Sequence, residues 1–361
     1  MDADVIIIGA GPAGSTAALL LARAGRRVLV LEKATFPRPK ICGGCLSGSA
    51  VAFLERQFPD RSWPGTPVRR IQFLIGSYQL STEVRGRTSI VERAEFDQFL
   101  SDEAQRAGAQ FIFGSAARLM RSGAGFEVEH RGERLKAKYI LIATGIGAMA
   151  AEFAEPLRPT NRPLIGQQWI ETTREGLPGV GQVEMHWLRG GYVGLATPRE
   201  SCTIVAYAAE VSGSDARPAW ARLREQNPAS RLWAVLGADA PQRNGARGAA
   251  GFPWQPRGVG RANVLLIGDA AGYREPFSGE GMGQAMHSAE HAVCAILSGA
   301  NVQARYAAAM KKYHAPRLRR LEWLGRALRI RLVQRLASGP AILPNRLVGR
   351  AVEWIHVRGT N

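Results

Sequence analysis

Two glycine-rich clusters hold the residues whose types and spacing could support chemistry. Gly9, Gly11 and Gly14 stand in G-x-G-x-x-G spacing directly after a run of valine and isoleucine. Far along the chain, residues 268–282 spell GDAAGYREPFSGEGM, with Asp269 near the start. In the first cluster the glycines permit a tight turn, close approach of the backbone to a pyrophosphate, and close helix–strand packing. That cluster therefore predicts a dinucleotide-binding site.

Three elements must position the first cluster. Residues 4–8 predict a buried parallel strand, residues 15–24 a helix stopped by Gly25, and residues 27–31 a second strand. The helix N-terminus offers free N–H groups and partial positive charge to a phosphate. Glu32 ends the second strand, where a carboxylate holds the adenosine ribose hydroxyls. An acidic residue there favours FAD or NAD over a 2′-phosphorylated cofactor.

Length and composition limit the class of protein. With 361 residues, 46% of them hydrophobic, the chain can fill the core of two joined lobes. No stretch of about eighteen uncharged apolar residues predicts a membrane-spanning helix. The first residues lack the regions of a signal peptide, and four cysteines show no disulfide scaffold pattern. We therefore expect a cytoplasmic protein.

Hydrophobic patterning outlines the remaining elements. Strands are predicted at residues 71–75, 81–84, 111–113, 126–130, 139–143, 167–170, 183–187, 203–207 and 263–267. Helices are predicted at residues 95–106, 216–236 with an interruption near Pro228, and 283–297. The aromatic, strand-like residues 160–210 indicate a second, antiparallel sheet.

Four motifs of the chain resemble those of the geranylgeranyl reductase-like flavoproteins. That family is related to aromatic hydroxylases of the para-hydroxybenzoate hydroxylase type and to flavin-dependent halogenases. Besides the two glycine-rich clusters, residues 36–44 (FPRPKICGG) are similar to F-P-R-x-K-x-C-G-G. Residues 93–100 (RAEFDQFL) are similar to R-x-x-F-D-x-x-L. The resemblance covers roughly residues 4–300 and implies bound FAD.

The resemblance also implies which residues contact FAD. The expected set is Gly9, Gly11, Pro12, Ala13, Gly14, Glu32, Lys33, Arg38, Cys42, Gly43, Gly44, Arg93, Ala117, Gly145, Asp269, Gly279, Gly281 and Met282. Within it, Ala13, Glu32 and Lys33 are expected at the ADP moiety, and Ala117 at the adenine.

Other members of this set are expected at the flavin and the ribityl chain. Residues 42–44 would lie beside the isoalloxazine, and Arg93 and Asp269 near the ribityl chain or the phosphates. Gly281 and Met282 would present backbone N–H groups at a helix start, which stabilises the negative charge of a reduced flavin.

Patterning and resemblance together predict an α/β fold. We expect a Rossmann-like three-layer FAD-binding lobe, an inserted antiparallel substrate-binding sheet and a helical C-terminal tail. The FAD-binding lobe is expected to be discontinuous, with the segments assigned as follows. Residues 1–70, 90–150 and 255–300 form this lobe, residues 71–89 and 151–254 the substrate lobe, and residues 301–361 the tail.

Three departures from the family's motifs bear on the reaction. Residues 142–147 (IATGIG) lack the D-G motif that is linked to NAD(P)H, so the donor stays open between NAD(P)H and a reduced protein carrier. Residues 191–198 (GYVGLATP) lack the Trp of the Y-x-W-x-x-P motif of polyprenyl reductases, which leaves a polyprenyl substrate open. The absence of a W-x-W-x-I-P motif argues against halogenation.

The sequence marks no single catalytic residue, but Cys42 and Glu280 are candidates. Cys42 forms a C-x-x-C with Cys45, either as an electron-exchanging dithiol or as a family motif with an incidental second cysteine. Glu280 lies between two glycines, as a proton donor or as a structural residue at a helix start. His186 and Trp187 could line the substrate pocket or pack in a core. One C-x-x-C supplies too few ligands for zinc, so no metal site is expected.

The C-terminal part is strongly basic in a chain whose net charge is +17. Residues 305–358 hold thirteen lysines and arginines against Glu322 and Glu353. Leucines at 318, 321, 324, 328 and 332 share one helical face. Two interpretations stand: a peripheral anchor on an anionic membrane surface, or a helix packed on the lobes with a solvated basic side. Nucleic-acid binding is not expected, because the sequence shows no recognition module.

These observations lead to one main hypothesis with two alternatives. The main hypothesis is an FAD-dependent reductase or dehydrogenase that delivers hydride to a carbon–carbon double bond of an apolar, isoprenoid- or polyketide-like substrate. The alternative enzyme is an FAD-dependent aromatic monooxygenase, which oxygen dependence separates from a reductase. The third hypothesis is a binding protein that keeps FAD as a structural element.

Overall fold

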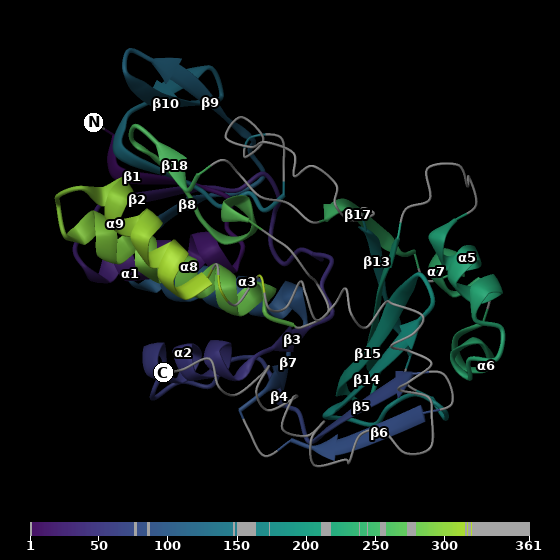
Figure 1. Cartoon of the computed structure of the whole chain (residues 1–361). Coiled ribbons are helices and arrows are strands. Elements are labelled where there is room, and N and C mark those ends of the chain that lie inside the picture. Colours follow the sequence, from purple (N-terminus) through teal and green to yellow (C-terminus); the bar gives the residue numbers. More distant parts are fainter. Residues whose placement is uncertain are drawn as a thin grey trace.

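Two lobes, each built on one large sheet, make up the described part of the chain (Figure 1). The computed structural model describes residues 2–75, 78–84, 87–146, 149, 164–172, 174–210, 218–237, 239–243, 245–252, 258–272, 279–314, 316 and 319. Within these residues, no helix is both long and apolar enough to cross a membrane. The predicted basic tail beyond residue 320, and residues 273–278 of the second glycine-rich cluster, lie outside the described residues.

A six-stranded sheet in the order β18-β19-β12-β1-β2-β8 organises the first lobe. Its strands are β1 (Ala3–Ile8), β2 (Val28–Leu31), β8 (Gln110–Ile112), β12 (Ala137–Ile142), β18 (Gly260–Arg261) and β19 (Val264–Leu266). Every neighbouring pair is parallel except β18 with β19. Both faces of a parallel sheet are usually covered by other elements, so its strands are apolar on both sides. This explains why β1, which is almost wholly buried, is a continuous apolar run.

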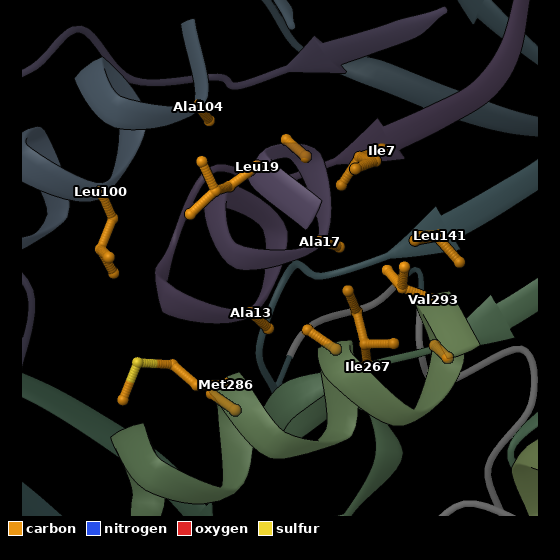
Figure 2. Close-up of a cluster of buried hydrophobic side chains, with 14 of the residues drawn as sticks. Ile7, Ala13, Ala17, Leu19, Leu100, Ala104, Leu141, Ile267, Met286 and Val293 are labelled. Atoms are coloured by element: carbon orange, nitrogen blue, oxygen red, sulfur yellow. The ribbon is translucent and has the colours of Figure 1, made fainter. Parts of the chain in front are cut away.

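Helices cover one face of this sheet and form the main core (Figure 2). They are α1 (Pro12–Arg23), α2 (Gly48–Gln57), α3 (Arg93–Arg106), α8 (Gly281–Leu297) and α9 (Val302–Ala309), followed by η2 (Met310–His314). Figure 2 shows α1, with Ala13 and Leu19, between α3, with Leu100, and α8, with Met286. This packing holds the N-terminus of α1 at the carboxyl edge of the sheet.

A small antiparallel sheet covers the opposite face. It contains β9 (Ala117–Ser122), β10 (Gly125–His130) and β11 (Glu133–Leu135). Val128 of β10 packs with Ile6 and Ile140 of the parallel sheet in a second buried cluster. The predicted α/β class and the three-layer first lobe are therefore confirmed.

The second lobe is a seven-stranded sheet in the order β17-β13-β16-β15-β14-β5-β6. Its strands are β5 (Arg70–Ile75), β6 (Tyr78–Glu83), β13 (Leu164–Glu171), β14 (Gln182–Leu188), β15 (Gly191–Arg199), β16 (Cys202–Glu210) and β17 (Arg247–Phe252). One face packs on α5 (Ala219–Gln226) and α6 (Leu232–Leu236) through Trp169, Trp220 and Leu223. In Figure 1 these helices and α7 (Ala240–Arg243) lie on the side away from the first lobe.

A short three-stranded sheet lies between the two lobes in Figure 1. It consists of β3 (Cys45–Leu46), β7 (Ser89–Ile90) and β4 (Thr66–Pro67). Ile90 packs with Val183 and Ile204 of the seven-stranded sheet in one buried cluster. The small sheet therefore ties the loop after β2 to the second lobe.

The structure differs from the sequence prediction in the pairing of the second sheet, which is not wholly antiparallel because β14 pairs with β5 in parallel. The interruption predicted near Pro228 within residues 216–236 is present between α5 and α6. There the side chain of Asn227 donates to the carbonyl oxygen of Leu223 at 2.7 Å. That side chain takes over a backbone acceptor at the end of α5, and the chain turns there.

Candidate functional site

A cavity of about 760 Å³ joins the two lobes. On the first lobe it is lined by residues at the carboxyl ends of β1, β2 and β12, and by Gly268 and Asp269 after β19. On the second lobe it is lined by the seven-stranded sheet. Ligands of open α/β sheets bind at the carboxyl ends of the strands, and the volume suits a small-molecule site.

The first glycine cluster forms a cradle in which side chains would not fit. At Gly9 the backbone has φ +102°, and a Cβ there would lie 2.6 Å from the carbonyl oxygen of Ala143. A Cβ on Gly14 would lie 1.9 Å from the carbonyl oxygen of Gly9. Gly11 differs, because its Cβ would lie 3.7 Å from the Arg38 guanidinium, on the wall of the cavity. This geometry suits a pyrophosphate at Gly11, beside the N-terminus of α1.

Glu32 is held rigidly at the end of β2. Its side chain is buried, and its two carboxylate oxygens accept hydrogen bonds from the backbone N–H groups of Ala10, at 2.7 Å, and Ala34, at 3.0 Å. The carboxylate lines the cavity next to Lys33. It can therefore accept hydrogen bonds from ribose hydroxyls, as the sequence predicts.

Two arginines share one buried carboxylate beside Gly11. Arg93 donates two hydrogen bonds to Asp97, at 2.8 and 2.7 Å, and Arg38 Nη1 lies 3.3 Å from the same carboxylate. Arg38 Nη1 is buried and has no hydrogen-bond partner among the described residues. Arg38 Nη2 also lies 3.8 Å from Glu32 Oε2, so the two guanidinium groups are held in place by two carboxylates at the edge of the cradle. Such a pair fits a phosphate ligand.

Lys40 and Asp269 lie against this pair. Burial, reinforced by the charges of Arg93 and Arg38, lowers the pKa of Lys40. Burial raises the pKa of Asp269, although the positive charges of Lys40 and Arg93 oppose the rise. The charged form of each group is therefore disfavoured. An anion in the cavity would relieve the repulsion among Lys40, Arg38 and Arg93.

The two cysteines of the C-x-x-C have different environments. Cys42 lines the cavity with its thiol against Arg93, and the backbone N–H of Gly44 donates to Cys42 Sγ at 3.4 Å. Burial, reinforced by Cys42, raises the pKa of Cys45 to about 12. A thiol with that pKa stays protonated at neutral pH, which argues against an electron-exchanging dithiol.

The loop that contains these cysteines is pressed against the second lobe. A Cβ on Gly43 would lie 4.0 Å from Ala206 Cβ, on β16. At Gly44 the backbone has φ +77°, and a Cβ would lie 2.7 Å from the carbonyl oxygen of Val91. The loop therefore forms the junction between the two halves of the cavity.

The N-terminus of α8 closes the cavity beside this loop. Gly279, Gly281 and Met282 line the cavity, together with Ala285 one turn further along. Glu280 stands at the N-cap position of the helix and is buried, but it is not one of the cavity-lining residues. A helix N-terminus at this position provides partial positive charge for an anionic ring system.

The half of the cavity on the second lobe is mostly apolar. Its wall includes Ile71, Phe73, Val183, Met185 and Ala206. His186 lies on the other face of the sheet. There Glu184 Oε2 lies 3.0 Å from His186 Nε2, and Glu184 Oε1 accepts a hydrogen bond at 2.8 Å from Arg231, which precedes α6. Trp187 packs with Tyr192 and Met185 on the cavity side without lining the cavity. Both residues therefore serve packing.

The structure brings most of the sequence-predicted residues to one cavity. Lining residues among them are Gly9, Gly11, Pro12, Ala13, Glu32, Lys33, Arg38, Cys42, Gly43, Arg93, Ala117, Gly145, Asp269, Gly279, Gly281 and Met282. Gly14 and Gly44 instead permit close backbone packing. Sequence reasoning missed Asp97, which the i,i+4 spacing from Arg93 could have indicated, and Thr88, for which the sequence carries no signal.

Comparisons with known proteins agree with this geometry. A family model described as FAD binding domain matches residues 2–324. The menaquinone reductase of Mycolicibacterium smegmatis is 29% identical over 328 residues, covering 82% of this chain and 77% of the relative. The digeranylgeranylglycerophospholipid reductase 1 of Methanopyrus kandleri is 30% identical, covering 83% of this chain and 80% of the relative.

The solved structures extend the agreement to the fold. A flavoprotein/dehydrogenase from Cytophaga hutchinsonii superposes with a TM-score of 0.77 at 17% identity, covering 99% of this chain and 93% of that one. At this identity the match bears on the fold alone.

Proposed function

Since this chain belongs to the FAD binding domain family and is an FAD-dependent oxidoreductase, we propose that it reduces a carbon–carbon double bond of an apolar, isoprenoid-like substrate. Relatives named for the reduction of menaquinone and of a digeranylgeranyl phospholipid support this assignment. The observation that carries it is the single cavity, which runs from the glycine cradle to the apolar face of the second sheet. When bound, reduced FAD supplies the hydride.

The protein's part is to bind, orient and shield the reactants. Glu32 would hold the ribose, Arg38 and Arg93 the pyrophosphate, and Ala117 the adenine. Gly281 and Met282 would place N–H groups at the flavin ring. The apolar wall around Phe73 and Met185 would hold the substrate and exclude water.

Reduction of a double bond needs a proton for the second carbon as well as a hydride for the first. We assign Cys42 as the candidate donor, because its thiol lines the cavity at the junction of the two halves. Glu280 is a weaker candidate, because it is buried at the start of α8 and does not line the cavity. A Cys42→Ser variant that reduces substrate at the parent rate would contradict this role for Cys42.

The test of the reaction is anaerobic reoxidation of the dithionite-reduced holoprotein. We expect a short-chain menaquinone or a geranylgeranyl lipid to reoxidise the flavin without O₂ and to gain two hydrogens across a double bond of its isoprenoid chain. Reoxidation that requires O₂ and yields an oxygenated product would instead identify a monooxygenase. A bound flavin that no reductant reduces and no substrate reoxidises would favour a protein that keeps FAD as a structural element. Anaerobic reduction of the oxidised holoprotein by NADH, NADPH or a reduced ferredoxin identifies the electron donor.

The division of the chain into lobes is part of the proposal. An FAD-binding lobe of residues 1–70, 90–150 and 255–300 contains the parallel sheet, and a substrate lobe of residues 71–89 and 151–254 contains the second sheet. Strand membership supports this division, with Arg70 of β5 at the boundary.

We also propose that the basic segment 305–358 attaches the protein to the anionic inner face of the cytoplasmic membrane. Its excess of positive charge and its leucine spacing support the proposal. An apolar substrate that resides in the membrane would then reach the cavity without crossing water.

A further inference from the structure

Thr88 is an isolated polar residue in the apolar half of the cavity. It lines the cavity directly before β7 and is 4% exposed. Its backbone oxygen accepts a hydrogen bond from Val68 N at 2.9 Å, so the backbone is satisfied. Its side-chain Oγ1 is buried and has no hydrogen-bond partner among the described residues.

Among the described residues, the packing on this side of the small sheet is apolar. Side chains two apart in an extended strand share a face, so Thr88 lies on the side of Ile90. Ile90 belongs to an apolar cluster with Ile71, Val183 and Ile204. A buried hydroxyl without a partner destabilises a fold, and such groups are rare in native proteins. A polar atom of a ligand in the cavity would supply the missing partner.

The position of Thr88 points to the substrate and not to the dinucleotide. A second buried hydroxyl without a partner among the described residues, that of Thr144, also lines the cavity. Thr144 follows β12 next to Gly145, on the FAD-binding lobe. Thr88 instead directly precedes β7 of the small sheet, which packs on the second lobe. Gly194 and Ala196, which also line the cavity, are small and leave volume for a ligand.

We infer that Thr88 is a specificity-determining residue whose hydroxyl bonds an oxygen of the substrate. The cavity would then take an apolar molecule with a carbonyl, hydroxyl or ether oxygen in its buried part, in preference to an unsubstituted hydrocarbon. This inference rests on the proposed function and names the substrate class of that site. A site built to hydrogen-bond a substrate rejects an analogue that lacks the bonding group, because its own polar group is then left unpaired.

The experiment measures binding to the oxidised holoprotein, through the change in flavin absorbance, for two probes. One is a short-chain menaquinone, and the other is a hydrocarbon polyene with the same number of isoprene units. Thr88→Val keeps the shape and removes the hydroxyl, and Thr88→Ser keeps the hydroxyl. Thr144→Val is the matched control, since it removes the other unpaired hydroxyl of the same cavity.

We expect Thr88→Val to raise the Kd of the menaquinone about tenfold, the size of one hydrogen bond, and to leave the hydrocarbon Kd unchanged. Thr88→Ser should stay within about threefold of the parent for both probes, because the donor is retained. Thr144→Val should leave the ratio of the two Kd values at the parent value.

Two results from the parent protein would overturn the inference: no binding of the menaquinone, or a hydrocarbon Kd equal to or below the menaquinone Kd. Two results from Thr88→Val would do the same: equal changes in the Kd values of both probes, or loss of FAD from the variant. Failure of the reductase proposal is a separate result. It would show as Thr88-dependent menaquinone binding without anaerobic reoxidation of the flavin. If the menaquinone reoxidises the flavin of Thr88→Val as fast as that of the parent protein, the reductase proposal stands and only the role of Thr88 is refuted.

Discussion

Asp97 holds the two arginines at the cradle, Arg38 and Arg93, in position. It is fully buried, and both Arg93 and Arg38 lie against its carboxylate. We expect Asp97→Asn to lower the free energy of unfolding by about 3 kcal/mol, because two buried guanidinium groups lose their shared counter-charge. Urea unfolding of the apoprotein measures this loss.

Glu95 on the same helix provides the control. It is exposed and pairs with Arg199 at 3.0 Å. Because solvent screens that pair, Glu95→Gln should change the free energy of unfolding by less than about 1 kcal/mol. Equal losses in the two variants would show that Asp97 carries no special role.

Asp269 gives the cavity a pH dependence whose sign can be worked out. Burial raises the folded-state pKa of Asp269 above its usual 3.8, so the folded protein binds this proton more tightly than the unfolded chain does. The resulting stability is complete below pH 3.8 and is lost as pH rises through the raised pKa. Apo Asp269→Asn should therefore melt above the parent at pH 7, with a gap that narrows as pH is lowered toward 4. Melting curves of both apoproteins across this range measure the gap, and a gap that widens toward acid would refute the burial argument.

At the residue scale, sequence predicts what depends on local geometry. The G-x-G-x-x-G spacing places Gly9, Gly11 and Gly14 because strand, turn and helix are contiguous in the chain. Thr88 was missed because its significance comes from apolar neighbours on β5, β14 and β16, far away in sequence.

Among the elements, the contact between α1 and the end of β1 leaves the least room for an added side chain. A Cβ on Gly14 would lie 1.9 Å from the backbone oxygen of Gly9, which cannot move without displacing the cradle. We expect Gly14→Ala to destabilise the protein by about 1–3 kcal/mol and to abolish FAD retention on gel filtration. Gly258→Ala is the control, because a Cβ at that glycine meets nothing within 4 Å. Full FAD occupancy in Gly14→Ala would contradict the placement of the cofactor.

The elements themselves were predicted unevenly from the sequence. Strands and helices with strong periodicity lie within a few residues of their predicted positions, as α3 and α8 do. The break between α5 and α6 was predicted near Pro228, because proline disfavours a continuous helix. The parallel pairing of β14 with β5 was not predicted, because it depends on a contact between distant segments.

At the scale of the whole molecule, charge is concentrated at the C-terminal end. A truncation after Ala315 removes ten of the thirteen lysines and arginines in residues 305–358. We expect it to weaken binding to phosphatidylserine-containing vesicles at least tenfold at low salt, with a difference that shrinks in 0.5 M salt. Neutral phosphatidylcholine vesicles are the control, and co-sedimentation measures binding. Equal binding of the truncated and full-length proteins would exclude the anchor.

The order in which the cradle is assembled has a consequence for biosynthesis. The core around α1 is completed by α8, and β12 gains its outer neighbour only with β19, although α1 and β1 are the first elements made. A chain still on the ribosome therefore exposes the apolar side of α1 until residues 264–297 have emerged. Contacts between such distant segments slow folding and leave apolar surface open to aggregation. FAD can be captured only near the end of synthesis, and until then the nascent N-terminal half is a natural client for chaperones.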